Sequence, residues 1–305
     1  MPQTIFSLAP LAPFRLDLTV WALRRRPHNA VDLWDGQTYR RAIVADDKPI
    51  AIEVIQRGSL DTPQLHVTAT GADVSPDGTA VTNVLRRLLG FDIDLTAFYE
   101  FAASDQHLGP LASRFRGFKP PRYATLFEAL LNGIACQQVT LNLGIQLLNR
   151  LAATCGVALA DHNPPLFTLP QPEGLAEQSS ETLRSLGFSW QKAQTMLDLS
   201  RAHLEGRLSF NDLDALDNEA IVGYLRQFRG IGRWTAEYVL LRGLGRVDVF
   251  PSGDSGARNS LRRWLDLDAS LDYAGVSQTI DPWRAYGGLI YLHLLLKGVA
   301  DAHPL

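Results

Sequence analysis

Asp254 is the residue of this sequence whose type and position best suit chemistry. It ends the loop Asp248-Val-Phe-Pro-Ser-Gly-Asp254 and directly precedes a helical pattern over 255–265. A fixed carboxylate stabilises positive charge that develops on a neighbouring carbon and helps to orient or deprotonate water. Aspartate at this place is also a common helix N-cap, and the two roles are compatible because capping holds the carboxylate in one orientation. Asp248 is the competing carboxylate, and we interpret it as structural.

A glycine pair precedes this loop by about twenty residues. Gly230-Ile231-Gly232 lies between two helical patterns, 219–228 and 234–244. Glycines allow a tight turn and close approach of the backbone to another molecule, and the free N–H groups of the following helix suit a phosphate. We expect Ile231 to anchor the turn in the core. Two glycines between helices are weak evidence alone, because most such pairs are only tight turns.

Trp234 and Tyr238 stand four residues apart, so they share one face of the expected helix. Their rings would attract a flat cationic group by roughly 0.5–2 kcal/mol. Taken alone, an aromatic pair at this spacing is more often core packing.

Composition sets limits on the class of protein. The 305 residues are 46% hydrophobic and 20% charged, which is typical of packed globular domains. The net charge is −3, but residues 221–263 hold eight arginines against three acidic residues, which favours a local basic face. Arg24-Arg25-Arg26 is interpreted as a solvated run. Cys136 and Cys155 are too few for a disulfide framework or a four-cysteine metal site.

The pattern of elements predicts an α+β protein: a small N-terminal antiparallel sheet domain followed by an all-helical body. Alternation over 16–20, 50–54 and 65–67 predicts strands, and a helix over 79–89 is expected to pack on the sheet. Further helices are expected over 95–103, 123–136, 139–154, 181–186, 190–204, 219–228, 234–244, 255–265 and 283–297. Gly206 and Gly245 should end two of them as left-handed caps. We place the domains at 1–110 and 111–305, with the hairpin at 225–236, and the segment from Pro164 to Pro172 could divide the helical part into two subdomains.

Two segments together resemble a known family. The hairpin Phe228-Arg-Gly-Ile-Gly-Arg-Trp-Thr-Ala-Glu-Tyr238, followed by the loop that ends at Asp254, resembles the helix-hairpin-helix DNA glycosylase superfamily, and most closely its 3-methyladenine DNA glycosylase II (AlkA-type) members. The run from Phe127 to Thr140 also resembles that family's first core helix and the loop after it. The resemblance covers about 124–298. Over the N-terminal sheet it rests on the pattern of elements alone.

The resemblance implies an activity and a set of site residues. Asp254 matches the catalytic aspartate, which would stabilise the oxocarbenium-like sugar as an alkylated purine leaves. Trp234 and Tyr238 match aromatic positions of the base pocket. The family's tryptophan in the last helix is missing, and Leu292 or His293 stands there, so the substrate contacts implied are Trp234, Tyr238 and Leu292.

The remaining implied contacts are with DNA. Gln138 matches the residue that fills the gap left by a flipped base, although a surface glutamine is the alternative. The implied DNA contacts are Gln137, Gln138, Gly230, Ile231, Gly232 and Arg233. The backbone carbonyls of Arg226, Phe228 and Gly230 resemble a set that holds a structural Na⁺ or K⁺ at the hairpin. No cofactor is expected for catalysis.

The sequence therefore predicts a monofunctional glycosylase that removes alkylated purines of the 3-methyladenine and 7-methylguanine type from damaged double-stranded DNA. A glycosylase for another lesion, such as hypoxanthine or an etheno adduct, and a non-enzymatic helix-hairpin-helix module that only binds DNA are the alternatives. A module that only binds DNA has no use for Asp254 or for the aromatic pair. We expect a cytoplasmic monomer with no signal peptide and no membrane span.

The residue at position 234 generates the first prediction. Family members that cleave the strand carry a lysine two residues after the second hairpin glycine, as the amine of a Schiff base, whereas this chain has Trp234. The protein should leave abasic sites without nicking the strand, as measured on end-labelled duplexes before and after alkali treatment. A covalent protein–DNA adduct trapped by borohydride would contradict this prediction, as would loss of activity in EDTA.

Overall fold

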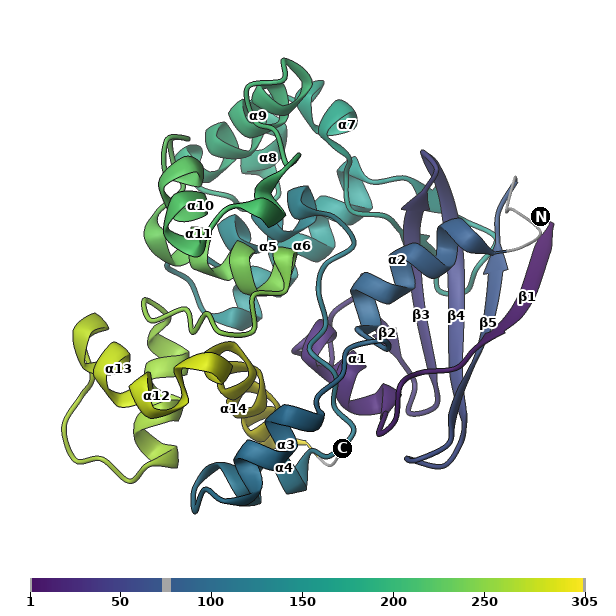
Figure 1. Cartoon of the computed structure of the whole chain (residues 1–305). Coiled ribbons are helices and arrows are strands. Elements are labelled where there is room, and N and C mark those ends of the chain that lie inside the picture. Colours follow the sequence, from purple (N-terminus) through teal and green to yellow (C-terminus); the bar gives the residue numbers. More distant parts are fainter. Residues whose placement is uncertain (1, 73–77, 304–305) are drawn as a thin grey trace.

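The computed structural model describes residues 2–72 and 78–303. Five antiparallel strands form a sheet at one end of the molecule, in the order β1-β5-β4-β3-β2 (Figure 1). The strands are β1 (Gln3–Leu8), β2 (Leu33–Trp34), β3 (Thr38–Ala45), β4 (Lys48–Gly58) and β5 (Pro63–Thr70). Alternating apolar residues of β3, β4 and β5 face α2 (Thr79–Leu89), as the sequence predicts for that helix. The α+β class is confirmed. The predicted ranges 50–54 and 65–67 fall within β4 and β5, whereas β1, β2 and β3 lie outside the predicted strand ranges.

The segment Leu16–Arg24 is the helix α1, so the predicted strand over 16–20 is wrong. Almost all of this helix is buried, which explains the misleading alternation. Leu16, Val20 and Leu23 pack with the sheet, whereas Leu18 and Trp21 pack with the C-terminal helices. A helix that is apolar on two faces lacks the single stripe that distinguishes a surface helix from a strand.

The helices form two groups around separate hydrophobic clusters, seen above and below each other in Figure 1. The first group contains α5 (Leu126–Cys136), α6 (Leu141–Cys155), α7 (Pro172–Ala176), α8 (Ser180–Ser185), α9 (Trp190–Leu204), η1 (Leu213–Ala215), α10 (Asn218–Leu225) and α11 (Arg233–Val239). The second contains α3 (Thr96–Ala103), α4 (Leu108–Arg114), α12 (Ser255–Trp264), α13 (Tyr273–Ile280), η3 (Asp281–Tyr286) and α14 (Gly287–Ala302). The π-helix η2 (Leu240–Leu244) connects them, because Leu240 belongs to one cluster and Leu241 to the other.

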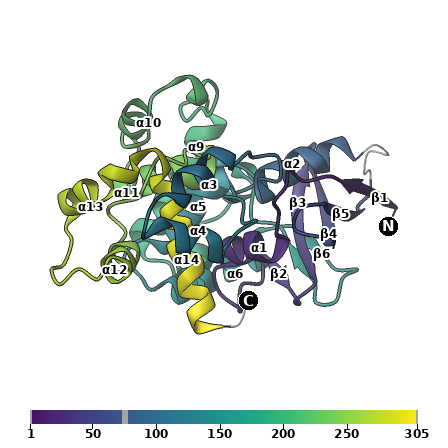
Figure 2. The same ribbon diagram turned by 60° about the horizontal axis from the view of Figure 1, so that its bottom comes forward.

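The division between these groups differs from the predicted one. The segment from Pro164 to Pro172 does not separate them, since Leu151 before it and Leu175 after it share one cluster. Part of it forms β7 (Leu166–Phe167), which pairs with β6 (Ala158–Leu159) and packs on the large sheet. The helices α3 and α4 pack with the C-terminal group, and Figure 2 shows them beside α14. The domain boundary near residue 110 stays a prediction.

The predicted left-handed caps are confirmed at both glycines. Gly206 has φ +73° and follows α9, and Gly245 has φ +83° and ends η2. Within the described ranges, no helix is long and apolar enough to cross a lipid bilayer.

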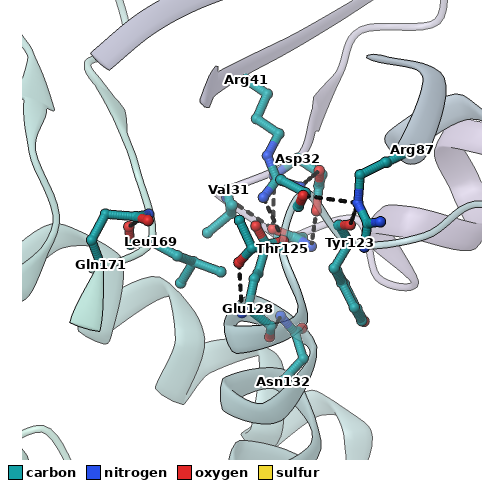
Figure 3. A network of polar contacts seen from close by, with 12 residues as sticks. Val31, Asp32, Arg41, Arg87, Tyr123, Thr125, Glu128, Asn132, Leu169 and Gln171 are labelled. Carbon is teal, nitrogen blue, oxygen red and sulfur yellow. Dashed lines mark hydrogen bonds and ion pairs between the residues drawn. The ribbon is translucent and has the colours of Figure 1, made fainter. Parts of the chain in front are cut away.

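A buried ion network joins the sheet to the helices. Arg41 on β3 donates to Asp32 at 2.8 Å and to Glu128 on α5 at 2.5 Å (Figure 3). Thr125 caps the same helix by accepting a hydrogen bond from the Glu128 amide. Because unpairing a buried charge is strongly unfavourable, this network holds α5 in a defined position against the sheet.

His293 on α14 generates a prediction about stability. Its ring is fully buried among Phe98, Phe115 and Phe118, and burial lowers its pKa from 6.5 to about 4. Below pH 6.5 the unfolded chain therefore binds a proton that the folded chain excludes. The free energy of unfolding keeps this contribution above pH 6.5 and loses up to about 3 kcal/mol as the pH falls toward 4.

The substitution His293→Leu removes the group whose protonation lowers the free energy of unfolding at low pH. Denaturant unfolding at pH 7, 6 and 5 should show the variant gaining stability relative to the native chain as the pH falls. Parallel pH dependence in the two proteins would show that His293 does not titrate in this way.

Candidate active site

The predicted hairpin connects α10 to α11 and is anchored from inside. Ile231 is 6% exposed and packs in the first helical cluster, as predicted. Gly230 has φ +89°, and a Cβ at this position would lie 2.1 Å from Oγ1 of Thr195. Gly232 has ordinary backbone angles and open space around it. The first glycine is therefore required by the turn itself, whereas the second leaves the backbone accessible.

Gln137 clamps the hairpin to the loop between α5 and α6. Its side-chain amide donates to the carbonyl of Gly230 and to Oγ1 of Thr235, both at 2.9 Å. The neighbouring Gln138 has φ +52° and an exposed side chain. A non-glycine residue in this conformation is uncommon and often marks a functional constraint. The clamp thus places Gln138 beside the hairpin with its side chain directed away from the core.

Arg233, which the sequence assigns to DNA, is engaged within the protein. It forms ion pairs with Glu219 and with Glu237, the latter at 3.0 Å, and donates to the Tyr273 hydroxyl at 2.7 Å. Burial raises the pKa of Glu237, and the hydrogen bonds from Tyr273 and Arg233 oppose that rise. Its contact with DNA stays a prediction.

Asp254 is the N-cap of α12, as the residue type predicts. Its Oδ1 accepts a hydrogen bond from the Ala257 amide at 2.9 Å. Its Oδ2 accepts one from the Tyr291 hydroxyl on α14 at 3.0 Å. Burial raises the pKa of Tyr291 well above its usual value, with the Asp254 charge acting in the same direction, so the phenol remains a protonated donor. Both carboxylate oxygens are consequently held in place.

One cavity of about 1110 Å³ brings the predicted residues together. Its wall includes Gln138, Gly230, Gly232, Trp234, Tyr238 and Asp254. Its volume exceeds that of ordinary small-molecule pockets, roughly 300–1,000 Å³. The cavity is large enough for one extruded residue of a polymer together with part of its backbone.

Trp234 and Tyr238 lie along one side of this cavity. Their ring centroids are 5.6 Å apart, with the planes tilted by 33°. The Tyr238 hydroxyl is 2.6 Å from the hydroxyl of Tyr123 and accepts a hydrogen bond from Arg25 at 3.0 Å. The hydroxyl of Tyr238 is thus engaged within the protein, and the side chain as a whole is only 4% exposed.

The last helix presents different residues from those expected. Leu292 is fully buried in the second helical cluster and is not part of the cavity wall, so the predicted substrate contact is corrected. The helix register directs Tyr291, Leu294 and Leu295 to the cavity. Tyr291 was missed because its role depends on a partner 37 residues away in the sequence.

The arginine run at the end of α1 is not a solvated surface, and that interpretation is wrong. Arg24 and Arg25 are buried. Arg25 lines the cavity and donates a hydrogen bond to Tyr238, which lies 213 residues further along the chain. Arg25 also donates to Oδ1 of Asn132 on α5 at 2.7 Å. Arg242, counted in the predicted basic face, is likewise buried in the cavity wall. No local pattern distinguishes these arginines from exposed ones.

Two of the three carbonyls expected at a cation site already accept hydrogen bonds. The Phe228 carbonyl accepts from the Ile231 amide, and that of Gly230 accepts from Gln137. A carbonyl oxygen keeps a second lone pair, so these hydrogen bonds do not by themselves prevent either oxygen from binding a monovalent ion. In the described part of the chain, no three His, Cys, Asp or Glu residues gather as metal ligands.

The sequence and the fold both match known proteins. Residues 131–285, half of the chain, match the family model described as HhH-GPD superfamily base excision DNA repair protein. The chain therefore belongs to this superfamily. It is 34% identical to DNA-3-methyladenine glycosylase 2 of Escherichia coli over 179 residues, which are 59% of this chain and 61% of that protein. It is 26% identical to the DNA-3-methyladenine glycosylase of Bacillus subtilis over 206 residues, or 68% of each chain.

The match with a further Bacillus subtilis relative, at 33% identity, spans only 57% of that protein's length. The fold as a whole resembles that of the 3-methyladenine DNA glycosylase from Archaeoglobus fulgidus, with a TM-score of 0.83 at 23% identity, over 98% of this chain and 99% of that one. The shared fold thus includes the N-terminal sheet.

The two hairpin glycines should respond differently to substitution. Gly230→Ala should lower the free energy of unfolding by about 1–3 kcal/mol, because alanine is strained at positive φ and its Cβ collides with Thr195. Gly232→Ala should leave stability within about 0.5 kcal/mol of the native chain. It should instead weaken binding to damaged and undamaged duplexes alike, because backbone contacts with phosphate carry no base information.

Denaturant unfolding and fluorescence anisotropy measure these two effects. Normal DNA binding by Gly232→Ala would show that the backbone does not approach phosphate at this turn. A stability loss in that variant as large as in Gly230→Ala would show that both glycines are needed only by the fold.

Proposed function

We propose that this protein is a monofunctional DNA N-glycosylase that extrudes an alkylated purine from duplex DNA and excises it, leaving an abasic site. The observation that carries the proposal is a carboxylate held by two hydrogen bonds, Asp254, in the same cavity as the pair Trp234 and Tyr238. Relatives named DNA-3-methyladenine glycosylase and the superfamily match support the same activity.

Asp254 supplies the electrostatic part of the reaction. As the bond between the sugar C1′ and the base nitrogen breaks, its electron pair leaves with the base and positive charge develops on the sugar. A carboxylate already fixed by the Ala257 amide and the Tyr291 hydroxyl stabilises this charge without reorganising. Water then adds to C1′, and Asp254 orients it or accepts its proton. Each step uses only water and the chain's own groups, so no metal or cofactor takes part.

The other cavity residues position the substrate. Trp234 and Tyr238 provide faces on which an extruded base stacks, at about 1–3 kcal/mol per base in comparable sites. Gln138, exposed and adjacent to the hairpin, fills the space that the base leaves in the duplex. Gly232 and the N-terminus of α11 receive a backbone phosphate. A Na⁺ or K⁺ held by the carbonyls of the hairpin would strengthen this contact.

Two alternatives make different demands on the cavity. A module that only binds DNA needs the hairpin, but it has no use for a large cavity or for Asp254 with both oxygens held. A glycosylase for other lesions would use the same carboxylate and differ only in the pocket wall. As a repair enzyme of this kind, the protein would work as a monomer on duplex DNA in the compartment that holds the genome.

Asp254→Asn tests the catalytic assignment. Asparagine also caps helices well, so the fold and DNA binding should be retained. Base release should fall by about a hundredfold or more, because a neutral amide cannot offset oxocarbenium charge. Single-turnover release of methylated bases from duplex DNA, with binding measured in parallel, provides the comparison.

Tyr291→Phe serves as a graded control. It keeps the charge of Asp254 but removes one of the two hydrogen bonds that orient it, so a smaller loss is expected. Near-normal turnover of Asp254→Asn would remove the carboxylate from the mechanism. Loss of DNA binding in that variant would point to a structural role.

A further inference from the structure

The wall of the cavity is positively charged in a chain that is slightly acidic overall. Among the described residues that line it, Asp254 is the one acidic residue. The basic residues are Arg25, Arg26, Lys192, Arg242 and Arg263. The whole sequence, by contrast, has 29 lysines and arginines against 32 aspartates and glutamates. Charge of one sign gathered in a concave surface attracts ions of the opposite sign, so the cavity suits a ligand that carries several negative charges.

Three of these basic side chains are already used by the protein. Arg25 is 4% exposed and Arg242 is 1% exposed, so a bound molecule does not reach them. The ammonium group of Lys192 donates to a backbone carbonyl near the end of α5 at 3.0 Å. Arg26 is partly exposed and Arg263 is exposed. These two are therefore the arginines of the wall that a ligand can contact directly.

Arg26 and Arg263 belong to elements on two sides of α14. Arg26 follows α1, and Arg263 is part of α12. Both elements pack against α14, which lies between them in Figures 1 and 2. Arginine stays protonated in proteins, so each side of α14 carries a permanent positive charge beside the cavity.

The surface of α14 between these charges forms an apolar groove. Tyr291, Leu294, Leu295 and Gly298 all line the cavity, and the helix rises about 10 Å from the first of them to the last. A Cβ at Gly298 would meet no other atom within 4 Å, so this end of the groove is open. The groove thus leads from Tyr291, which holds Asp254, to the outside of the molecule.

Neither arginine at the groove is neutralised by an acidic side chain. In the part of the chain that the structure describes, Arg26 donates to Oδ1 of Asn142 at 2.7 Å, and Arg263 donates to the Ser260 hydroxyl at 3.3 Å. These acceptors are uncharged, whereas Arg233 at the hairpin is paired with two glutamates. A guanidinium group without a carboxylate partner can bind a phosphate through two parallel hydrogen bonds.

The shape of the groove indicates a polymer as the ligand. It opens into the space that holds Asp254 and the aromatic pair, so a molecule that occupies both must have one part in the pocket and a continuation along α14. A small anion would need neither the apolar floor nor the connection to the pocket. A sugar–phosphate chain has charges at its edge for the arginines and less polar sugar faces for the floor.

We propose that the groove along α14, between Arg26 and Arg263, binds the phosphates of the lesion-bearing strand on the flank of the lesion opposite to the hairpin contact. The inference rests on the glycosylase function proposed above and adds a second backbone site to it. The hairpin belongs to the first helical group and α14 to the second. A strand bound at both places is held on either side of the extruded nucleotide, which fixes its sugar near Asp254.

The dependence of DNA binding on salt provides the first test. Arg26→Gln and Arg263→Gln should each weaken binding to duplex DNA by about threefold to tenfold and lower the slope of log affinity against log salt by about one. Arg26→Lys keeps the charge and should keep the slope. Arg262→Gln is the matched control, because that side chain donates to the Leu267 carbonyl and lies outside the cavity wall.

Equal losses in Arg262→Gln and Arg263→Gln would overturn the inference, because the effect would then follow from net charge alone. Unchanged slopes in Arg26→Gln and Arg263→Gln would overturn it as well. A native chain that neither binds duplex DNA nor releases bases would instead contradict the glycosylase function itself.

Neutral phosphates then locate the contact. Single methylphosphonates are placed in turn along both strands, and the loss caused by Arg263→Gln should disappear at one position of the lesion-bearing strand. That position should lie across the lesion from the one at which the loss caused by Gly232→Ala disappears. Partial misfolding would weaken binding whichever phosphate is neutral. Coupling on the hairpin's own flank, to the complementary strand or to no phosphate would overturn the inference.

Discussion

The buried guanidinium of Arg25 is the interaction on which the arrangement of the site depends. It lies where α1 ends and donates to Asn132 on α5 and to Tyr238 on α11. One side chain thus joins the N-terminal part of the chain to two helices that line the cavity. Because the hydrogen bonds of a charged, planar donor are strong and directional, small rotations of these helices are opposed. The ring of Tyr238 is oriented by the same contact.

Two further connections complete the frame. Arg41 holds α5 to the sheet through Glu128, one helical turn before Asn132, and Gln137 at the end of α5 holds the hairpin. The helix α5 therefore carries contacts to the sheet, to α1 and to the hairpin along its length. Its position determines where Gln138 meets the cavity. The N-terminal sheet consequently contributes to the geometry of the cavity although it supplies no residue of the hairpin or of the loop that ends at Asp254.

Local patterns in the sequence determined most of the helices, the hairpin turn and the cap at Asp254, because each depends on residues within a few positions of one another; α4, α7 and α13 were not predicted. Gly230 shows this well: its positive φ follows from the turn in which it lies. The role of Leu16–Arg24 was mistaken because burial on two faces removes the periodicity that marks a helix. Only the tertiary structure decided that Tyr291 rather than Leu292 faces the cavity, and that Arg25 and Arg242 are buried there. Those outcomes depend on helix register and on partners up to 220 residues away, which no local spacing records.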